Sequence, residues 1–428
     1  MKIAFFTLGC KVNSYESQEL AELMTAAGHT IVNSDCEADA YIVNSCTVTA
    51  ESSRKSRQAL RRFRSEHPNA IIVLTGCYAQ AFSKEADEKC DADIIIGNKT
   101  NSELPRLLEE FAASGKKAVD VLPHLQSDPF KGNAIHTFEG HTRAFLKIQD
   151  GCNRYCTYCI IPKSKGFSRS KPLEDVRKEV KELAKHGYKE IVFVGINLSS
   201  YGMDIGLNLC DALEEAEKTD GIERIRLGSL EPDHITDEVI ERLSKMSKFC
   251  PQFHLSLQSG CNDVLRKMNR HYSAEEYAKL CEKLKNAFPD LSLTTDIIVG
   301  FPGETEEMFK ETVEYAKKIR FMKVHVFPYS PREGTPAATY PNPVPNAVKA
   351  ERCRKLQHEC DIIRSEILLE HIGAVVPVLF ETPKNNIQHG YTKNYIPIKV
   401  PTLKTLTGEI RNVRITDADS DGCTGELI

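Results

Sequence analysis

The stretch AFLKIQDGCNRYCTYCII (residues 144–161) joins an apolar run to three closely spaced cysteines. The run predicts a buried strand, and Cys152, Cys156 and Cys159 follow directly after it. Active sites of parallel β/α barrels gather at the carboxyl ends of the strands, so we expect these cysteines in a functional loop. Structural zinc usually takes four ligands and disulfides use cysteines in pairs, so three thiols favour an iron–sulfur cluster with one open iron. The alternative is a zinc site completed by a distant His or Cys.

The alternation of strands and helices continues along the rest of this region. Apolar strand candidates are separated by helical stretches such as 173–187 and 273–288. Six successive β/α units predict a curved parallel sheet in the form of an open or partial barrel, whereas eight would predict a closed one. The strand candidates are 144–149, 190–195, 224–229, 252–258, 291–300 and 322–328.

The N-terminal region also alternates short apolar runs with helical stretches, and three of its runs end at a cysteine. Continuous apolar runs predict the buried parallel strands of an α/β sheet. Cys10, Cys46 and Cys77 stand just beyond the predicted strand ends, where open α/β sheets bind their ligands. We therefore expect these cysteines to form a second three-thiol site, with a purely structural role as the alternative.

The chain changes character towards its C-terminus. A long charged helix is predicted after the proline-rich segment 340–349, and short strands with turn residues follow it as a small all-β unit. The segment 116–142 has prolines, glycines and weak periodicity, which indicates a linker. The predicted domains are 1–118, 138–371 and 372–428.

The composition suits a chain of two or three packed domains. Its 428 residues are 41% hydrophobic, and 56 basic against 60 acidic side chains give a net charge of −4. Contact with a polyanion would therefore depend on local basic clusters. No run approaches the roughly 18 apolar residues of a membrane span, and the apolar stretch after Lys2 is too short for a signal sequence. We expect a cytoplasmic protein with no membrane partner, in which 15 cysteines point to metal or redox chemistry.

The spacing Cys-x3-Cys-x-aromatic-Cys resembles the signature of radical S-adenosylmethionine (SAM) enzymes. The resemblance implies that Cys152, Cys156 and Cys159 hold a [4Fe–4S] cluster whose fourth iron binds SAM. One electron from the cluster then cleaves SAM to a 5′-deoxyadenosyl radical. It also implies that polar residues near the motif and at the strand ends line the pocket for SAM and substrate, although each alone reads equally well as a polar loop residue. These are Tyr158, Asn197, Ser229, Glu231, Gln258, Ser259, Asp296 and Gly300, with Tyr329 and Arg332 as catalytic candidates.

Two open clusters in one chain resemble the methylthiotransferases, over essentially the whole sequence. That family has an N-terminal cluster domain, a radical SAM domain and a C-terminal RNA-binding TRAM domain. The stretch GYTKNYIPIKV (390–400) of this chain resembles the TRAM motif. The resemblance implies that Cys10, Cys46 and Cys77 hold an auxiliary [4Fe–4S] cluster and act in catalysis by presenting sulfur, so that C–H becomes C–S–CH3. An aromatic C–H bond is neither acidic nor a leaving group, so acid–base catalysis has little to act on.

The sequence TLGCKVNSYES (7–17) resembles the branch that acts on N6-threonylcarbamoyladenosine at position 37 of tRNA, next to the anticodon. Gly228 is a small departure, because the family more often has Ser there. The alternatives are isopentenyl-adenosine in tRNA and an aspartate of a ribosomal protein. Outside the family, the alternative is a non-catalytic metal-containing RNA-binding protein. The implied partners are the anticodon loop of tRNA, an electron donor and a sulfur source.

Basic residues cluster near both cysteine motifs, where they would meet a phosphate backbone. Solvated basic faces are the alternative interpretation. Tyr391 and Tyr395 are candidates for stacking on exposed bases. We expect removal of residues 372–428 to weaken tRNA binding and to leave both clusters intact. The clustered basic residues are Arg54, Arg57, Arg61, Arg64, Lys163, Lys165, Arg169, Lys171, Arg266, Lys267 and Arg270.

Overall fold

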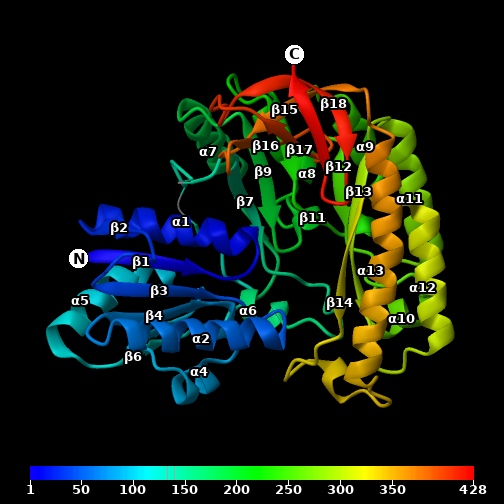
Figure 1. The fold of residues 1–428 in the computed structure, drawn as a ribbon. Coiled ribbons are helices and arrows are strands. Elements are labelled where there is room, and N and C mark those ends of the chain that lie inside the picture. Colours follow the sequence, from blue (N-terminus) through cyan, green and yellow to red (C-terminus); the bar gives the residue numbers. More distant parts are fainter. Residues whose placement is uncertain (133, 139) are drawn as a thin grey trace.

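The computed structural model describes residues 1–132, 134–138 and 140–428, which form three joined parts (Figure 1). An N-terminal sheet with its helices, blue to cyan, lies beside a central curved set of strands and helices. A small barrel of strands, orange to red, lies against one end of the central part. The predicted fold class is confirmed: a parallel α/β sheet, a partial β/α barrel and a closed all-β barrel. Within the described residues, no helix is both long and apolar enough to cross a membrane.

The N-terminal sheet has six parallel strands in the order β2-β1-β3-β4-β5-β6. Every residue of β3 and β4 is buried, because helices cover both faces of the sheet. The strands β2 and β6 are three residues long and exposed to half-buried, so no continuous apolar run marks them in the sequence. The strands are β1 (Lys2–Thr7), β2 (Thr30–Val32), β3 (Ala40–Ser45), β4 (Ile71–Gly76), β5 (Ile94–Ile96) and β6 (Ala118–Asp120).

Helices pack on both faces of this sheet. Leu20 of α1 and Leu104 of α5 belong to one core cluster. Phe63 of α2 and Tyr78 of α3 belong to the cluster on the other face. The first turn of α2 is capped by Thr49, whose hydroxyl accepts from a backbone N–H. The helices are α1 (Lys11–Ala26), α2 (Ala50–Glu66), α3 (Cys77–Ala81), α4 (Ser83–Lys89), η1 (Asn101–Glu103) and α5 (Leu104–Ser114).

Seven parallel strands of the central part form the predicted open wall, because the predicted strand 224–229 is divided into β10 and β11. They belong to two sheets, β10-β9-β7-β8 and β11-β12-β13-β14, which a bridge between Ile225 and Phe249 joins. The strand β8 is antiparallel to β7, so the outer strands of the wall are β8 and β14. The strands are β7 (Ala144–Asp150), β8 (Arg169–Ser170), β9 (Glu190–Gly195), β10 (Arg224–Leu227), β11 (Ser229–Leu230), β12 (Gln252–Leu255), β13 (Ser292–Val299) and β14 (Lys323–Pro328).

Amphipathic helices cover the outside of this wall (Figure 1). Capping boxes start two of them, at Asn208 before α8 and at Ser273 before α11. The apolar stripe of α12, which includes Phe309 and Val313, is buried in the central core. The helices are α6 (Ile161–Lys165), α7 (Leu173–Lys185), η2 (Leu198–Ser200), α8 (Leu209–Glu217), η3 (Pro232–His234), α9 (Asp237–Ser244), α10 (Asn262–Lys267), α11 (Ala274–Ala287), α12 (Glu306–Ile319), η4 (Pro336–Thr339) and α13 (Asn346–Leu369).

The C-terminal strands close into a barrel in the order β15-β16-β17-β19-β18. The stretch 391–400 does not form one continuous strand, because the chain turns at Tyr395 with a φ of +68°. Tyr391 therefore ends one strand, and Pro397 begins the next. The strands are β15 (Val375–Phe380), β16 (Ile387–Tyr391), β17 (Pro397–Pro401), β18 (Ile410–Ala418) and β19 (Cys423–Leu427).

Two arginines on β10 join this barrel to the central wall. Arg224 donates to the carbonyl oxygens of Tyr391 at 2.8 Å and Pro377 at 2.9 Å. Arg226 donates to the Lys393 carbonyl oxygen at 3.0 Å. Both guanidinium groups are buried, and a buried charge is costly without partners, so these hydrogen bonds fix the barrel in place.

Candidate active site

The three-cysteine loop, residues 152–159, follows β7 directly. Gly151 turns the chain with a φ of +69°, and a Cβ there would lie 1.8 Å from the Phe167 carbonyl oxygen. Only glycine fits this turn. The Cys152 N–H donates to the Gly166 carbonyl oxygen at 3.0 Å, which holds the loop against the segment that follows it.

An arginine reaches the middle cysteine of this loop. Arg270 Nη1 lies 3.1 Å from Cys156 Sγ, and its Nε donates to the Tyr272 hydroxyl at 3.0 Å. The same guanidinium pairs with Glu231. A cation beside a sulfur favours the thiolate, which is the form that binds metal. Glu231 and Tyr272 therefore orient the group that faces Cys156.

Cys152 and Cys159 are largely removed from solvent, which favours the neutral thiol in the chain by itself. Burial raises the pKa of Cys159 to about 12 and that of Cys152 to about 11. Metal binding would release these protons, since thiolates are the ligands. No three His, Cys, Asp or Glu side chains surround a single-ion position in the described part of the chain. A four-iron cluster differs from a single ion because each thiolate binds a separate iron.

The structure brings Cys10, Cys46 and Cys77 together at the carboxyl ends of neighbouring strands β1, β3 and β4. A Cβ on Gly9 would lie 3.1 Å from the Cys46 Cβ, so the first two loops touch. Burial raises the pKa of Cys77 to about 12, with Cys46 and Cys10 near enough to add to the increase. The three thiols of the second predicted site therefore share one place in the fold.

Buried polar side chains hold these loops in position. Asn13 Nδ2 donates to the carbonyl oxygens of Leu8 and Ser45, both at 3.0 Å. The Ser45 hydroxyl donates to the Thr75 carbonyl oxygen at 2.5 Å and accepts from the Tyr78 N–H at 3.2 Å. These hydrogen bonds connect the loops after β1, β3 and β4, which carry the three cysteines.

A buried ion network joins the two cysteine sites. Lys165, at the end of the helix after the three-cysteine loop, lies 2.6 Å from both carboxylate oxygens of Glu16 on α1. Lys147 Nζ lies 2.7 Å from Glu16 and 2.8 Å from Asp150. The Lys165 ammonium also opposes the burial that raises the pKa of Cys77. The charges between the sites are therefore paired inside the protein.

Several basic residues predicted to face RNA phosphates have internal partners instead. Lys165 and Lys171 are buried, the latter paired with Glu179, so that prediction is wrong for both. Arg270 is also buried and serves Cys156. Position next to the cysteine motif could not separate these lysines from exposed ones, since their partners come from other elements.

Asn197 lies beside the start of the three-cysteine loop. Its N–H donates to Gln149 Oε1 at 2.7 Å, and Gln149 Nε2 donates to the Gly151 carbonyl oxygen at 2.9 Å. The side-chain Oδ1 of Asn197 is buried without a partner in the described chain. An orphaned buried acceptor fits a ligand that donates a hydrogen bond. Tyr158 lies within this loop, and burial raises its pKa despite the Arg270 charge nearby.

Three predicted cofactor-binding residues have structural partners. Gln258 takes a φ of +68° and donates its N–H to the Asp296 carbonyl oxygen. The Ser259 hydroxyl lies 3.2 Å from that of Thr312. Gly300 has a φ of +72°, and a Cβ there would lie 2.4 Å from the Lys349 side chain. Direct contact of these three with a cofactor stays a prediction.

Tyr329 and Arg332 follow β14 and come from the loop that meets the N-terminal part. The Tyr329 ring packs on Phe301 with centroids 5.2 Å apart, and its hydroxyl is buried without a partner in the described chain. Arg332 Nη2 donates to Thr47 Oγ1 at 2.6 Å. Thr47 follows Cys46 in the chain, so Arg332 anchors the loop of the second thiol site.

A cavity of about 690 Å³ lies where the three parts meet. Cys10 lines it from the N-terminal part, and Ser229 and Asp296 line it from the central strands. Sequence reasoning missed most of the remaining wall, although alternate residues of β12, of β14 and of β13 as far as Asp296 are polar or aromatic and line the cavity. The missed residues include His254, Lys323, His325, Phe327 and Arg364.

Tyr391 and Tyr395 close this cavity from the C-terminal barrel. Their rings stack on each other with centroids 4.5 Å apart. The Arg143 and Arg226 guanidinium groups lie over the Tyr395 ring at 5.2 Å and 4.6 Å. The predicted stacking on exposed RNA bases is therefore replaced by stacking within the protein.

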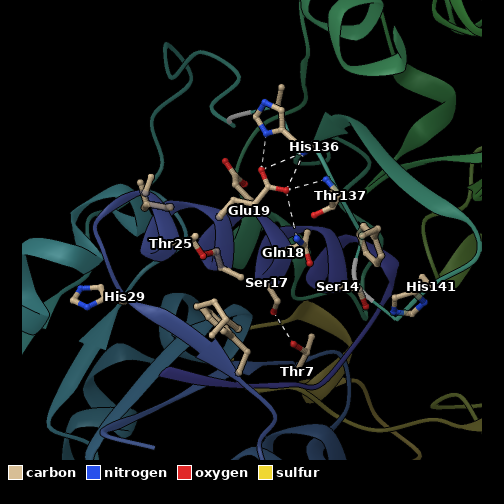
Figure 2. A pocket seen from close by; sticks show the side chains of 18 of the residues that line it. Thr7, Ser14, Ser17, Gln18, Glu19, Thr25, His29, His136, Thr137 and His141 are labelled. Carbon is tan, nitrogen blue, oxygen red and sulfur yellow. Dashed lines mark hydrogen bonds and ion pairs between the residues drawn. The ribbon is translucent and has the colours of Figure 1, made fainter. Parts of the chain in front are cut away.

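A larger cavity of about 1130 Å³ runs along α1, between β1 and the segment 134–138 (Figure 2). Figure 2 shows His29, His136 and His141 around it, with the Thr7 and Ser17 hydroxyls 2.6 Å apart. Among the described residues, none of the predicted site residues lines this cavity. The candidate active site is therefore the central cavity.

Comparison with known proteins finds family matches over the regions that carry the two cysteine sites. The Radical SAM superfamily matches residues 146–316, and Uncharacterized protein family UPF0004 matches residues 2–97. Threonylcarbamoyladenosine tRNA methylthiotransferase MtaB of Bacillus subtilis is 38% identical over 100% of this chain and 96% of its own. Its namesake from Aquifex aeolicus is 40% identical over 96% of this chain and 99% of its own. The chain belongs to the methylthiotransferase family.

The family also includes relatives that are named for another substrate. The tRNA-2-methylthio-N(6)-dimethylallyladenosine synthase of Caldicellulosiruptor saccharolyticus is 36% identical over 99% of this chain and 91% of its own. Among solved structures, the radical S-adenosylmethionine methyltransferase TsrM from Kitasatospora setae is similar, with a TM-score of 0.57 and 13% identity. The alignment covers 90% of this chain and 79% of that one, and it shows the fold alone. This methylthiotransferase is a radical SAM enzyme.

SAM and [4Fe–4S] clusters are the cofactors of this methylthiotransferase. The side chains fit them, because each site gathers three cysteines and the orphaned Asn197 Oδ1 can accept a hydrogen bond from a ligand. When bound, the cofactors supply the one-electron cleavage of SAM. The chain itself contributes the thiols, the Arg270 charge beside Cys156 and a cavity that the C-terminal barrel borders on one side.

Proposed function

We propose that this enzyme converts N6-threonylcarbamoyladenosine at position 37 of tRNA, next to the anticodon, to its 2-methylthio derivative. The observation that carries the proposal is the central cavity, which Cys10 lines together with Ser229 and Asp296 of the central strands. A base bound there would meet the sulfur-bearing site and the SAM-bearing strands at once. The relatives named for threonylcarbamoyladenosine, at 38% and 40% identity, support this substrate.

One alternative substrate has a specific observation in its favour. The relative named for dimethylallyladenosine is 36% identical over nearly the same span. Identity by itself separates the two branches weakly, so the substrate must be tested directly. Both substrates would use the same cavity and the same six cysteines.

The proposed roles follow from where the side chains lie. Arg270 holds the Cys156 thiolate, and Glu231 orients Arg270. Arg332 acts as a positioning residue for the Cys46 loop through its hydrogen bond to Thr47. Tyr158, Asn197, Ser229 and Asp296 are proposed to contact SAM or the substrate. The SAM cluster is assigned to Cys152, Cys156 and Cys159, and the auxiliary cluster to Cys10, Cys46 and Cys77.

The proposal includes a division of labour along the chain. Residues 1–118 would carry the auxiliary cluster, 138–371 the SAM chemistry and 372–428 a contact with tRNA. The reaction also needs an electron donor for the clusters and a source of sulfur. We place the enzyme in the cytoplasm, where its thiols stay reduced and tRNA is available.

The test is a reaction with defined tRNA. The anaerobically reconstituted enzyme is incubated with SAM, sulfide, a reductant and tRNA that carries N6-threonylcarbamoyladenosine, and the nucleosides are analysed by mass spectrometry. We expect the 2-methylthio derivative to form. A parallel reaction uses tRNA that carries isopentenyl-adenosine. Conversion of that tRNA alone would replace our substrate with the alternative.

Two cysteine variants test whether the auxiliary site takes part in the reaction. Cys36→Ala changes an exposed cysteine outside both sites and should retain turnover. Cys10→Ala should abolish methylthiolation. A Cys10→Ala enzyme with unchanged turnover would exclude the auxiliary site from the reaction.

A further inference from the structure

One end of the central cavity is positively charged. Lys323 begins β14 and Arg364 lies on α13, and both line the cavity where the C-terminal barrel closes it. Burial, together with the nearby Arg364 charge, lowers the pKa of Lys323, and Asp361 only partly opposes this. The two cations are therefore close together and incompletely balanced.

Polar atoms around this end lack partners in the described chain. Arg364 Nη2 donates to the Asp421 carbonyl oxygen at 2.8 Å, but Arg364 Nε is buried and unpaired. The Ser292 hydroxyl on β13 is also buried without a partner. His254 Nε2 lies 3.3 Å from Asp296 Oδ2 without hydrogen-bond geometry. Buried polar groups are costly when unpaired, so these atoms indicate a ligand that accepts hydrogen bonds.

The strand register gives the order of groups along the wall. Lys323, His325 and Phe327 alternate on β14 and all face the cavity. A strand rises about 3.3 Å per residue, so Lys323 and Phe327 are roughly 13 Å apart. Phe327 is an exposed ring at the carboxyl end of its strand, the edge at which the residues predicted to contact SAM also lie.

We propose that Lys323 and Arg364 bind the carboxylate of the threonylcarbamoyl substituent, an inference that rests on the proposed function. The adenine lies towards Phe327, and its N6 substituent extends along the wall to the two cations. A carboxylate accepts charge-assisted hydrogen bonds from both side chains and balances their charge. The isopentenyl group is a neutral hydrocarbon and would leave both cations unpaired. This end of the cavity therefore selects against it.

Other charged groups face the same space. A second possible anion at Lys323 and Arg364 must also be distinguished from the substrate carboxylate. Lys11 adds a further cation, while Asp296 lies beside His254 and His325. A phosphate of the tRNA backbone has the same kind of charge as the carboxylate. Every tRNA carries the phosphates, whereas only the modified nucleotide carries the carboxylate. A comparison of two tRNAs that differ only in this substituent distinguishes the sources.

The experiment uses the reconstituted enzyme and its Lys323→Gln and Arg364→Gln variants. Each is titrated at fixed salt with tRNA that carries N6-threonylcarbamoyladenosine and with the same tRNA that carries unmodified adenosine. We expect the wild type to bind the modified tRNA more tightly than the unmodified one. In each variant the ratio of the two affinities should be about tenfold smaller. The loss should appear in KM more than in kcat. Lys323→Arg and Arg364→Lys keep the charge and should keep most of the preference.

The outcomes are separable. An unchanged preference in both variants overturns the carboxylate site, and so does an equal weakening of both tRNAs, which would assign the cations to phosphates. A wild-type enzyme that fails to convert the modified tRNA instead refutes the proposed function. Lys279→Gln, exposed on α11, is the matched control. Because Arg364 contacts the C-terminal barrel, Lys323→Gln alone decides the question if Arg364→Gln does not fold.

Discussion

Lys165 Nζ lies 2.6 Å from both carboxylate oxygens of Glu16, so the helix after the SAM motif is joined to the helix after Cys10 by a buried ion pair. Lys147 adds a second ammonium at 2.7 Å. All three side chains are buried, so water cannot replace a lost partner. The relative position of the two cysteine sites therefore depends on Glu16.

Glu16→Gln should lower the free energy of unfolding by about 3–5 kcal/mol, because two ammonium groups stay buried without their carboxylate. Thermal unfolding of the cluster-free chain, followed by circular dichroism, measures the change. The control is Glu66→Gln, which removes an exposed pair with Arg62 at 3.8 Å and should cost less than about 0.5 kcal/mol. A similarly small cost for Glu16→Gln would show that the network does not hold the parts together.

The Glu16 carboxylate should also make the stability of the folded chain depend on pH. Burial alone would raise the pKa of Glu16, but Lys147 and Lys165 outweigh it and hold the pKa below the ordinary 4.5. A lowered folded-state pKa adds stability that is present above the unfolded value and is lost as the pH falls through the folded one. The urea midpoint of the cluster-free chain should therefore decrease below pH 4.5, and Glu16→Gln should lose less over that range. Equal decreases in the two chains would contradict the assignment.

The strand ends that carry Cys10, Cys46 and Cys77 could be predicted from the sequence. A buried parallel strand is a continuous apolar run, and the carboxyl ends of such strands meet at one edge. The pairing of Glu16 with Lys165 could not be predicted, because the two residues are 149 positions apart and each lies in a charged helical stretch. Local patterns set the elements, whereas the docking of separate parts sets these partners.

The wall of the central cavity shows the same limit. The alternation along β14 places Lys323 and Phe327 on one face, which the sequence does contain. Whether this face borders a cavity depends on the C-terminal barrel. Arg224 and Arg226 hold the barrel over the face through hydrogen bonds to backbone carbonyl oxygens. Every residue has a backbone carbonyl group, so the sequence does not indicate which carbonyl oxygens accept these hydrogen bonds. The cavity thus appears only when the three parts are assembled.

Iron content should separate the two cysteine sites. Cys46→Ala should reduce the iron from about eight to about four atoms per chain and leave reductive SAM cleavage in place. Cys156→Ala should lose as much iron but also abolish SAM cleavage. Cys36→Ala should match the wild type in both measurements, since that exposed cysteine lies in neither site. Loss of SAM cleavage with Cys46→Ala would mean that the sites do not load independently.

Arg332 should act through the loop that carries Cys46. Arg332→Ala removes the guanidinium that donates to the buried Thr47 and Ser53 hydroxyls, at a cost of about 1–3 kcal/mol, and should alter the electron paramagnetic resonance spectrum of the auxiliary cluster without loss of iron. Thr47→Val removes the same hydrogen bond from the other side and should give the same spectrum. If Arg332→Ala abolishes turnover with an unchanged spectrum, Arg332 contacts the substrate instead.

Deletion of residues 372–428 should do more than weaken tRNA binding. The buried Arg224 and Arg226 would lose their carbonyl acceptors, so we now expect lower thermal stability and poorer cluster retention. A cleaner test of RNA contact is Lys404→Glu, because Lys404 is exposed on the barrel. This variant should weaken tRNA binding, reduce the salt dependence of log K by about one unit and leave the iron content unchanged. A truncated chain with the wild-type melting temperature and full iron content would show that the barrel is not needed to satisfy these arginines.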